Sequence, residues 1–274
     1  MRPSSSLGSN GTSLDAPLVE LAGVGKRFYR KGQAVQACQN VSLSVRRGEF
    51  VAIVGPSGCG KSTLLNMVAG LMSPTSGSVC YAGQPVRDVN RRVGYVTQRD
   101  NLLPWASVEK NVSLALDIAG VNGGERKQRV ADQIRGVGLE GFENHYPAEL
   151  SGGMRKRVAL ARTLIYEPET ILMDEPFGAL DAQLKLILQD QLLRIWERLK
   201  QTLLFVTHDL AEAVALADRV VVLSSRPGTI RRIETIDLPR PRDVFNVRFT
   251  ERFGELHQVL WEALEQHVMQ GQDV

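Results

Sequence analysis

The chain has 274 residues, of which 43% are hydrophobic and 23% are charged, as in ordinary globular proteins. A chain of this length can bury a large core, in one large domain or two small ones, without disulfides or metals to stabilise it. Its 33 Lys and Arg against 30 Asp and Glu give a net charge of +3, too small an excess to indicate a nucleic-acid surface. Three cysteines with no close CxxC pair fit a reducing compartment, by default the cytoplasm.

The first segment, residues 1–17, is rich in Ser and Gly and has no apolar stretch of the kind found in a secretory signal. We interpret it as a flexible tail. The longest apolar runs elsewhere, such as Thr202–Val206, are far shorter than the roughly 20 residues that a membrane-spanning helix needs. The sequence therefore predicts a folded chain that does not itself cross a membrane.

Strands are predicted at 18–21 and 39–45, followed by an uninterrupted apolar run at Phe50–Val54. Such a run is typical of a strand buried on both faces, and a predicted helix at Ser62–Leu71 follows it after a glycine-rich segment. A strand, a glycine loop and a helix in this order can hold a phosphate group, because backbone N–H groups and the positive end of the helix point toward it.

The glycine-rich segment matches the pattern GxxxxGK[ST] of the P-loop, or Walker A motif. Lys61 is expected to reach the β and γ phosphates of a bound nucleotide, and Ser62 to supply a hydroxyl ligand to Mg²⁺. Kinases, GTPases and ATPases share this loop, so it leaves the reaction open. The residues expected to contact the nucleotide here are Gly55, Ser57, Gly58, Cys59, Gly60, Lys61, Ser62 and Thr63.

Residues 102–164 carry apolar positions at helical spacing, interrupted by turn signals, and predict a mostly helical insert. Strands are expected again at Thr170–Met173, Thr202–Thr207 and Val220–Leu223, with helices between them, which indicates a parallel sheet. Further along, 229–238 alternates and Glu251–Met269 is predicted to be an amphipathic helix.

Two carboxylates, Asp174 and Glu175, follow the strand Thr170–Met173 directly. Ligands of open α/β sheets usually bind at this end of the strands. Asp174 is expected to hold Mg²⁺, directly or through water, while Glu175 polarises the attacking water as a general base. Together with the P-loop, this pair indicates hydrolysis of a nucleotide.

The segment Leu150–Arg157 resembles the LSGGQ-type signature of ATP-binding cassette (ABC) proteins, with Lys156 where Gln is commoner. Ser151 is a good helix N-cap, and Gly152 and Gly153 leave the first helical N–H groups uncovered, which makes a second anion site. In that family the signature faces the γ phosphate bound to the other subunit. The resemblance therefore implies that two copies of the chain enclose two ATP molecules.

Other positions match the family in order, across residues 18–245. Gln98 resembles the Q-loop glutamine that senses Mg²⁺ and the attacking water, and His208 resembles the switch histidine that contacts the γ phosphate. Ala179-Leu180-Asp181 resembles the D-loop, which places Asp181 against the partner subunit. For the aromatic that stacks on adenine, Phe28 is favoured by position and Tyr29 stays open.

The resemblance implies an ATPase with Glu175, His208, Lys61 and Gln98 as catalytic residues and ATP and Mg²⁺ as ligands. Its expected fold is α/β, a P-loop NTPase (RecA-like) core with an antiparallel β-subdomain and a helical insert. We assign residues 18–98 and 165–235 to the core with its β-subdomain, 99–164 to the helical signature subdomain and 236–274 to a C-terminal extension. The C-terminal helix can be a dimer contact, a cap on the core or a regulatory tail.

A single P-loop and signature without a spanning segment resembles bacterial importers, whose membrane subunits are separate polypeptides. Leu102-Leu103-Pro104-Trp105 is similar to the LLPW segment of importers for nitrate, sulfonates and taurine, and offers an apolar groove to the coupling helix of a permease. Arg226-Pro227-Gly228 and 237–242 are similar to the tail of the same group. We expect ATP-driven uptake of a small organic compound or anion at the cytoplasmic face of the cell membrane, with a substrate-binding protein acting indirectly and no nucleic-acid partner.

Two other classes of function stay open. One is a soluble cassette ATPase that acts on nucleic acid or another macromolecular complex, against which the modest net charge counts. The other is a small-molecule kinase with the same P-loop, which predicts no ATP-dependent dimer.

Overall fold

The computed structural model describes residues 16–30, 32–121, 123–178 and 180–268. The tail predicted for residues 1–17 lies outside these ranges except for its last two residues. Ala179 of the D-loop-like segment and Met269 of the predicted C-terminal helix also lie outside them. Within the described ranges, no helix combines the length and apolar character needed to cross a bilayer.

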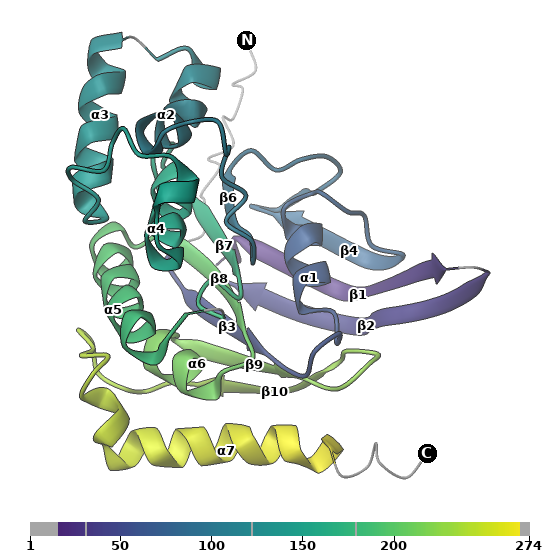
Figure 1. Ribbon diagram of the computed structural model, residues 1–274. Helices are drawn as coiled ribbons and strands as arrows, with labels where there is room; N and C mark the ends of the chain where they lie inside the picture. The colour runs from purple at the N-terminus through teal and green to yellow at the C-terminus, as the bar shows by residue number, and fades with distance from the viewer. Residues whose placement is uncertain (1–15, 31, 122, 179, 269–274) are drawn as a thin grey trace, which may run out of the picture.

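An antiparallel sheet in the strand order β2-β1-β4-β5 forms one side of the molecule (Figure 1). Its strands are β1 (Val19–Arg30), β2 (Gln33–Val45), β4 (Ser76–Tyr81) and β5 (Gln84–Pro85). One face buries Leu21, Val41 and Val79, while alternate residues of β2 are exposed. This alternation is typical of an antiparallel sheet that meets the core on one side.

The strands β1 and β2 extend well beyond the predicted ranges 18–21 and 39–45, and β4 was not predicted. The pairing of β1 with β2 shifts register three times between Leu21 and Arg27. Each shift reverses the face on which the next side chains lie, so the period-2 pattern is broken. A search for alternating apolar and polar residues therefore does not find the parts of β1 and β2 nearest to the turn of this hairpin.

A second sheet of six strands holds the centre of the molecule in the order β10-β9-β3-β8-β7-β6. Neighbouring strands pair in parallel except β10, which is antiparallel to β9. Every residue of β3, β7 and β8 is buried, which explains their continuous apolar sequences. The strands are β3 (Phe50–Val54), β6 (Val93–Val96), β7 (Thr170–Asp174), β8 (Thr202–Thr207), β9 (Arg219–Leu223) and β10 (Ile230–Thr235).

Helix α1 (Lys61–Val68) lies between the two sheets (Figure 1), and its Leu64, Leu65 and Met67 join one apolar cluster with side chains of both. The opposite face of the central sheet is covered by α5 (Ala182–Leu199), α6 (Leu210–Leu216) and α7 (Glu251–Val268). Helix α7 follows a short 3-10 turn, η2 (Val247–Phe249), and buries Phe253, Leu256 and Leu260 in the second cluster. The helix therefore packs on the core, while a dimer contact and a regulatory role for it stay predictions.

Three helices gather at one end of the molecule (Figure 1): α2 (Val108–Ala119), α3 (Gly123–Gly136) and α4 (Gly152–Leu164), with the 3-10 turn η1 (Pro147–Glu149) before α4. They enclose an apolar cluster of their own that includes Val112, Leu116, Ile134 and Val158. The insert is therefore helical, as expected. The exact division of the chain into subdomains stays a prediction.

Candidate functional site

The glycine-rich segment leaves the end of β3 and turns into α1. Gly58 and Gly60 have φ angles of +76° and +99°, a region that residues with a Cβ rarely adopt. The loop borders an open cavity, and most of the residues predicted to contact a nucleotide line it. Its lining consists of Ala37, Ser57, Gly58, Gly60, Lys61, Ser62, Thr63, Gln98, Glu175 and Arg226.

Lys61 is buried and folds back over its own loop. Its Nζ donates to the carbonyl oxygens of Gly55, at 2.8 Å, and Pro56, at 3.0 Å. Both acceptors are neutral, and within the described part of the chain no carboxylate forms an ion pair with this ammonium, although its charge helps to lower the pKa of nearby Asp174. An anion such as a phosphate group would be the favourable partner of this charge.

Ser62 and Asp174 meet from α1 and β7, where the Ser62 hydroxyl donates to Oδ1 of Asp174 at 3.0 Å. Burial raises the pKa of the Asp174 carboxyl, as does neighbouring Glu175, while the Ser62 hydrogen bond lowers it. These oxygen atoms suit Mg²⁺, which binds through one or two protein ligands together with waters and substrate phosphates. The described residues contain no group of three or more His, Cys, Asp and Glu side chains arranged for a metal.

Glu175 has a φ of +46°, an unusual angle for a residue with a side chain and one that is often found at functional sites. Its Oε2 accepts a hydrogen bond from Nε2 of Gln98 at 3.2 Å and lies 3.5 Å from Nδ1 of His208. The three residues follow β6, β7 and β8, which are adjacent in the sheet. Parallel pairing thus brings Gln98 and His208, which were predicted separately, to the carboxylate of Glu175.

The signature segment begins α4, where the Ser151 hydroxyl caps the helix by accepting from the backbone N–H of Met154 at 3.3 Å. Ser151 and Gly152 are exposed, and neither lines the P-loop cavity. Gly153 packs tightly instead: a Cβ there would lie 2.4 Å from Cδ2 of Leu184. Within one chain, the predicted second anion site therefore faces solvent.

Lys156, where the sequence departs from the common signature, donates from Nζ to the backbone carbonyl of Gln98. Burial lowers the pKa of Lys156. The same contact joins α4 to the Gln98 loop, and both segments border a further cavity together with Gly152 and Leu180. The substitution thus ties the signature helix to a predicted catalytic residue.

Like the signature residues, Asp181 and Phe28 were predicted to contact the nucleotide but lie away from the cavity. Asp181 caps α5 by accepting from the backbone N–H of Leu184 at 2.9 Å. Phe28 and Tyr29 are 37% and 74% exposed, and neither lines the cavity, although Nζ of Lys26 lies 5.6 Å from the centre of the Phe28 ring. The choice of the aromatic that stacks on adenine, and the partner contact of Asp181, stay predictions.

Arg226 and Ala37 line the cavity without having been predicted as site residues. Nε of Arg226 donates to the carbonyl of Gly58 at 3.1 Å. The following Gly228 bonds to β2: its N–H donates to Ala37 and its carbonyl accepts from Gln39, both at 2.9 Å. Arg226-Pro227-Gly228 was noted only for its similarity to the tail of an importer group, because its contact with a loop 168 residues earlier has no local pattern.

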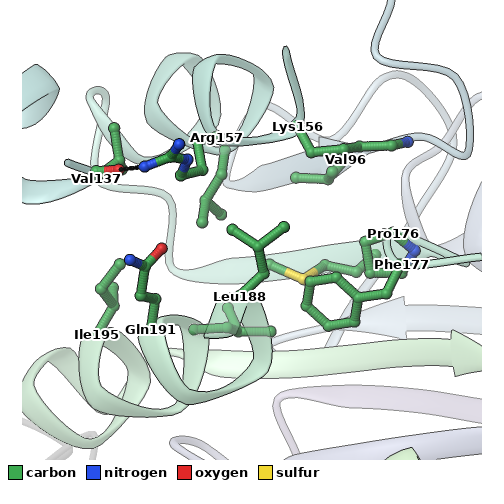
Figure 2. Close-up of a pocket in the computed structure, with 12 residues that line it drawn as sticks. Val96, Val137, Lys156, Arg157, Pro176, Phe177, Leu188, Gln191 and Ile195 are labelled. Carbon is green, nitrogen blue, oxygen red and sulfur yellow. Dashed lines mark hydrogen bonds between the residues drawn. The ribbon is translucent and has the colours of Figure 1, made fainter. Parts of the chain in front are cut away.

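A second cavity lies between α4 and α5, behind the end of β7 (Figure 2). Apolar side chains such as Val96, Leu188 and Phe177 dominate its wall, and none of the residues that line it is a carboxylate, a hydroxyl or a histidine. Of its two cations, Arg157 donates from Nη1 to the carbonyls of Val137 and Gly138. This space lies between the signature helix and the core, and the residues that line it include no group that can carry out hydrolysis.

A P-loop between a parallel strand and a helix, with carboxylates at the end of another parallel strand of the same sheet, defines a P-loop nucleotide hydrolase. The family model described as "ABC transporter" matches residues 38–178, and this chain belongs to that family. The predicted family is thereby confirmed. With it, the chain is an ATPase of the ABC type.

The chain is 49% identical to an uncharacterized ABC transporter ATP-binding protein of Methanocaldococcus jannaschii over 235 residues, 86% of this chain and 88% of the relative. It is 47% identical to a nitrate import ATP-binding protein of Synechocystis, covering 81% and 83% of the two chains. An aliphatic sulfonates import ATP-binding protein of Bacillus cereus is 40% identical, with 90% and 96% covered.

Among solved structures, the chain resembles a dimeric ATP-binding cassette in a post-hydrolysis state bound to ADP and Pi. The TM-score is 0.72 at 35% identity, covering 81% of this chain and all of that one. A cassette from Clostridium perfringens that is part of the cbiONQ ABC transporter complex gives a TM-score of 0.72 at 25% identity, with 88% and 93% covered. These likenesses confirm the predicted fold class.

Proposed function

We propose that this chain is the ATP-hydrolysing subunit of an importer, in which two copies close around ATP and drive uptake of a small anion through separate membrane subunits. Two of the relatives are named for the import of nitrate and of aliphatic sulfonates, which supports an anion of that kind as the cargo. The chain works at the cytoplasmic face of the membrane, where its permease holds it. A substrate-binding protein delivers the cargo to that permease.

The chemistry is hydrolysis of the bond between the β and γ phosphates. Lys61 exchanges its two neutral carbonyl partners for phosphate oxygens, and the loop N–H groups and the start of α1 add positive potential. Glu175 accepts the proton of the attacking water. Gln98 and His208 contact the same carboxylate oxygen and hold it in place for that transfer. Mg²⁺, held by Ser62 and Asp174, would neutralise charge on the phosphates.

The observation that carries the import proposal is the exposed Trp105 on a fixed loop close after Gln98. Trp105 is 74% exposed, whereas Leu102, predicted to share its groove, is buried in the helical cluster. The loop is held by Asn111, which is fully buried and bonds to both the N–H and the carbonyl of Leu103. A large exposed aromatic on a rigid loop is a typical anchor for a partner protein.

The test uses vesicles that contain the complete chain, its permease and the binding protein. ATP enclosed in the vesicles together with the chain should drive accumulation of radiolabelled nitrate, taurine or an alkanesulfonate in their interior. Glu175→Gln should abolish this accumulation while ATP still binds. The purified chain is assayed beside it for phosphate release. Hydrolysis without uptake of any of these anions would contradict the importer proposal.

The alternative, a soluble cassette ATPase that acts on a macromolecular complex, is addressed by the same preparation. Recovery of nucleic acid with the tagged chain, with phosphate release stimulated by that nucleic acid, would favour the alternative.

A further inference from the structure

A buried group of charged and polar side chains lies directly behind His208, and the chemistry above does not use it. Glu212 of α6 is only 2% exposed. Nζ of Lys185, from α5, lies 2.6 Å from Oε1 of Glu212 and 2.8 Å from Oδ2 of Asp209. Buried charges of this kind are costly unless further hydrogen bonds complete their surroundings.

Those hydrogen bonds fix both neighbours of His208 in the sequence. The hydroxyl of Thr207 donates to Oε2 of Glu212 and accepts from the backbone N–H of Asp209 at 3.0 Å. Asp209 in turn caps α6, since its Oδ1 accepts from the N–H groups of Ala211 and Glu212 at 2.8 and 3.1 Å. The His208 side chain itself is 57% exposed. Its direction toward Glu175 is therefore set by the residues on either side rather than by packing of the ring.

The same group reaches the C-terminal part of the chain. Gln189 of α5 is fully buried, and its Nε2 donates to Oε1 of Glu212 at 3.0 Å. Its own Oε1 accepts from Nη2 of Arg248 at 2.9 Å. Arg248 belongs to η2, the turn that leads into α7. A continuous series of polar contacts thus runs from the C-terminal segment to the residues beside His208.

Burial raises the pKa of Glu212, whereas the ionisation of Lys185 and Asp209 supports a fixed arrangement. Burial alone would lower the pKa of Lys185, but its hydrogen bonds to Asp209 and Glu212 raise it above its ordinary value. Burial alone would raise the pKa of Asp209, but the hydrogen bond from Lys185 lowers it. Both groups are therefore charged at neutral pH and attract each other across α5 and α6.

We propose that Glu212, Lys185, Gln189 and Arg248 are positioning residues that hold His208 against Glu175 and make ATP hydrolysis depend on the C-terminal segment. The inference rests on the role proposed above for His208. None of the four residues lines the P-loop cavity, so they act on the reaction through the turn Thr207–Asp209. Their loss should affect the chemical step more than nucleotide binding.

The experiment compares Arg248→Ala with Arg252→Ala in the complete chain. Arg252 lies nearby at the start of α7, but it pairs with exposed Asp237 and not with the buried group. Arg248→Ala should lower kcat for ATP hydrolysis by about fivefold or more while KM for ATP stays within about twofold, and Arg252→Ala should change neither. Hydrogen exchange should speed up at the Asp209 amide but not in β3, a local effect that general destabilisation does not give.

The outcomes separate the two proposals, because His208→Ala is measured in parallel. If His208→Ala loses hydrolysis and Arg248→Ala keeps the wild-type kcat, the positioning role is refuted and the proposed function stands. If His208→Ala itself hydrolyses ATP normally, the role of His208 in the proposed function is refuted. Should Arg248→Ala not fold, Arg248→Met keeps the length of the side chain and removes its N–H groups, and the same kcat result decides.

Discussion

Single residues far from the P-loop in sequence determine its shape. A Cβ added to Gly228 would lie 1.9 Å from the carbonyl oxygen of Cys59, which is less than any non-bonded contact allows. The guanidinium of Arg226 lies against Gly58 at the tip of the loop. The turn 226–228 therefore supports the phosphate-binding backbone from outside.

Gly228→Ala is expected to displace the loop and weaken ATP binding, with KM for ATP raised by about tenfold or more, since small displacements of a binding group have effects of this size. Gly254→Ala is the matched control, because Gly254 lies in α7 and a Cβ there meets no atom within 4 Å. It should bind ATP normally and be slightly more stable, by about 0.5–1 kcal/mol. Titration with a fluorescent ATP analogue measures the affinity of the two variants, and thermal unfolding measures their stability. Equal affinities would contradict the supporting role of the turn.

The two carboxylates after β7 and the P-loop lysine could be found in the sequence because each follows a buried strand within a local pattern. Lys61, Asp174 and Glu175 belong to segments in which hydrophobicity, glycine and charge change over a few residues. Arg226 was missed because its partner Gly58 is distant in the sequence and its own surroundings are an ordinary turn. Residues that act through long-range contacts leave no periodic or local signal.

At the scale of elements, the helices and buried strands were largely foreseen, and the outer hairpin was not. Strands such as β3 and β8 are buried throughout and give continuous apolar runs, whereas the register shifts in β1 remove the alternation that would reveal it. The position of α7 also depends on tertiary structure. Its amphipathic sequence predicted a helix, and only the buried Phe253, Leu256 and Leu260 show which face it covers.

Arg242 fastens the C-terminal extension to the core. It is 6% exposed and donates to the carbonyls of Ala217, Ile236 and Leu238, and burial lowers its pKa to about 10, so it is still charged at neutral pH. Arg242→Ala should reduce the free energy of unfolding by about 3–5 kcal/mol, because several buried carbonyls lose their donor.

Urea unfolding followed by circular dichroism measures this loss. Arg252→Ala, which breaks exposed ion pairs with Asp237 and Glu255, should cost less than about 1 kcal/mol. Equal losses for the two variants would show that Arg242 does not have the anchoring role.

Asn111 holds the loop that presents Trp105, through hydrogen bonds to backbone groups of Leu103, Ala106 and Ser107. Asn111→Ala should destabilise the chain by about 1–3 kcal/mol, because these groups lose their partner. Hydrolysis by the isolated chain should persist, while stimulation by the permease should be lost.

Trp105→Ala removes the proposed permease contact without changing the hydrogen bonds of Asn111 that hold the loop. It should leave stability unchanged, since the ring is exposed, and weaken binding to the permease by about tenfold or more. Surface plasmon resonance measures the affinity of each variant for the permease in detergent. Normal binding by both variants would place the permease contact elsewhere.

For the molecule as a whole, the arrangement of the site implies that one chain is incomplete. The P-loop, Gln98, Glu175 and His208 lie together, while the uncovered N–H groups at the start of α4 face solvent at Ser151 and Gly152. Such a helix terminus favours an anion. We predict that a second copy supplies one by bringing its P-loop nucleotide to this terminus, an arrangement suggested by the resemblance to a dimeric cassette with ADP and Pi.

Glu175→Gln tests this arrangement, because the amide cannot accept the proton of the attacking water and ATP persists in the site. With ATP the variant should elute from size-exclusion chromatography at twice the mass of the 30.2 kDa chain, and with ADP as a monomer. Adding Ser151→Arg to the same variant places a long side chain at the start of α4 and should prevent the dimer while ATP binding persists. A variant that stays monomeric at saturating ATP would show that the site is complete in one chain, which would leave the exposed signature without a partner.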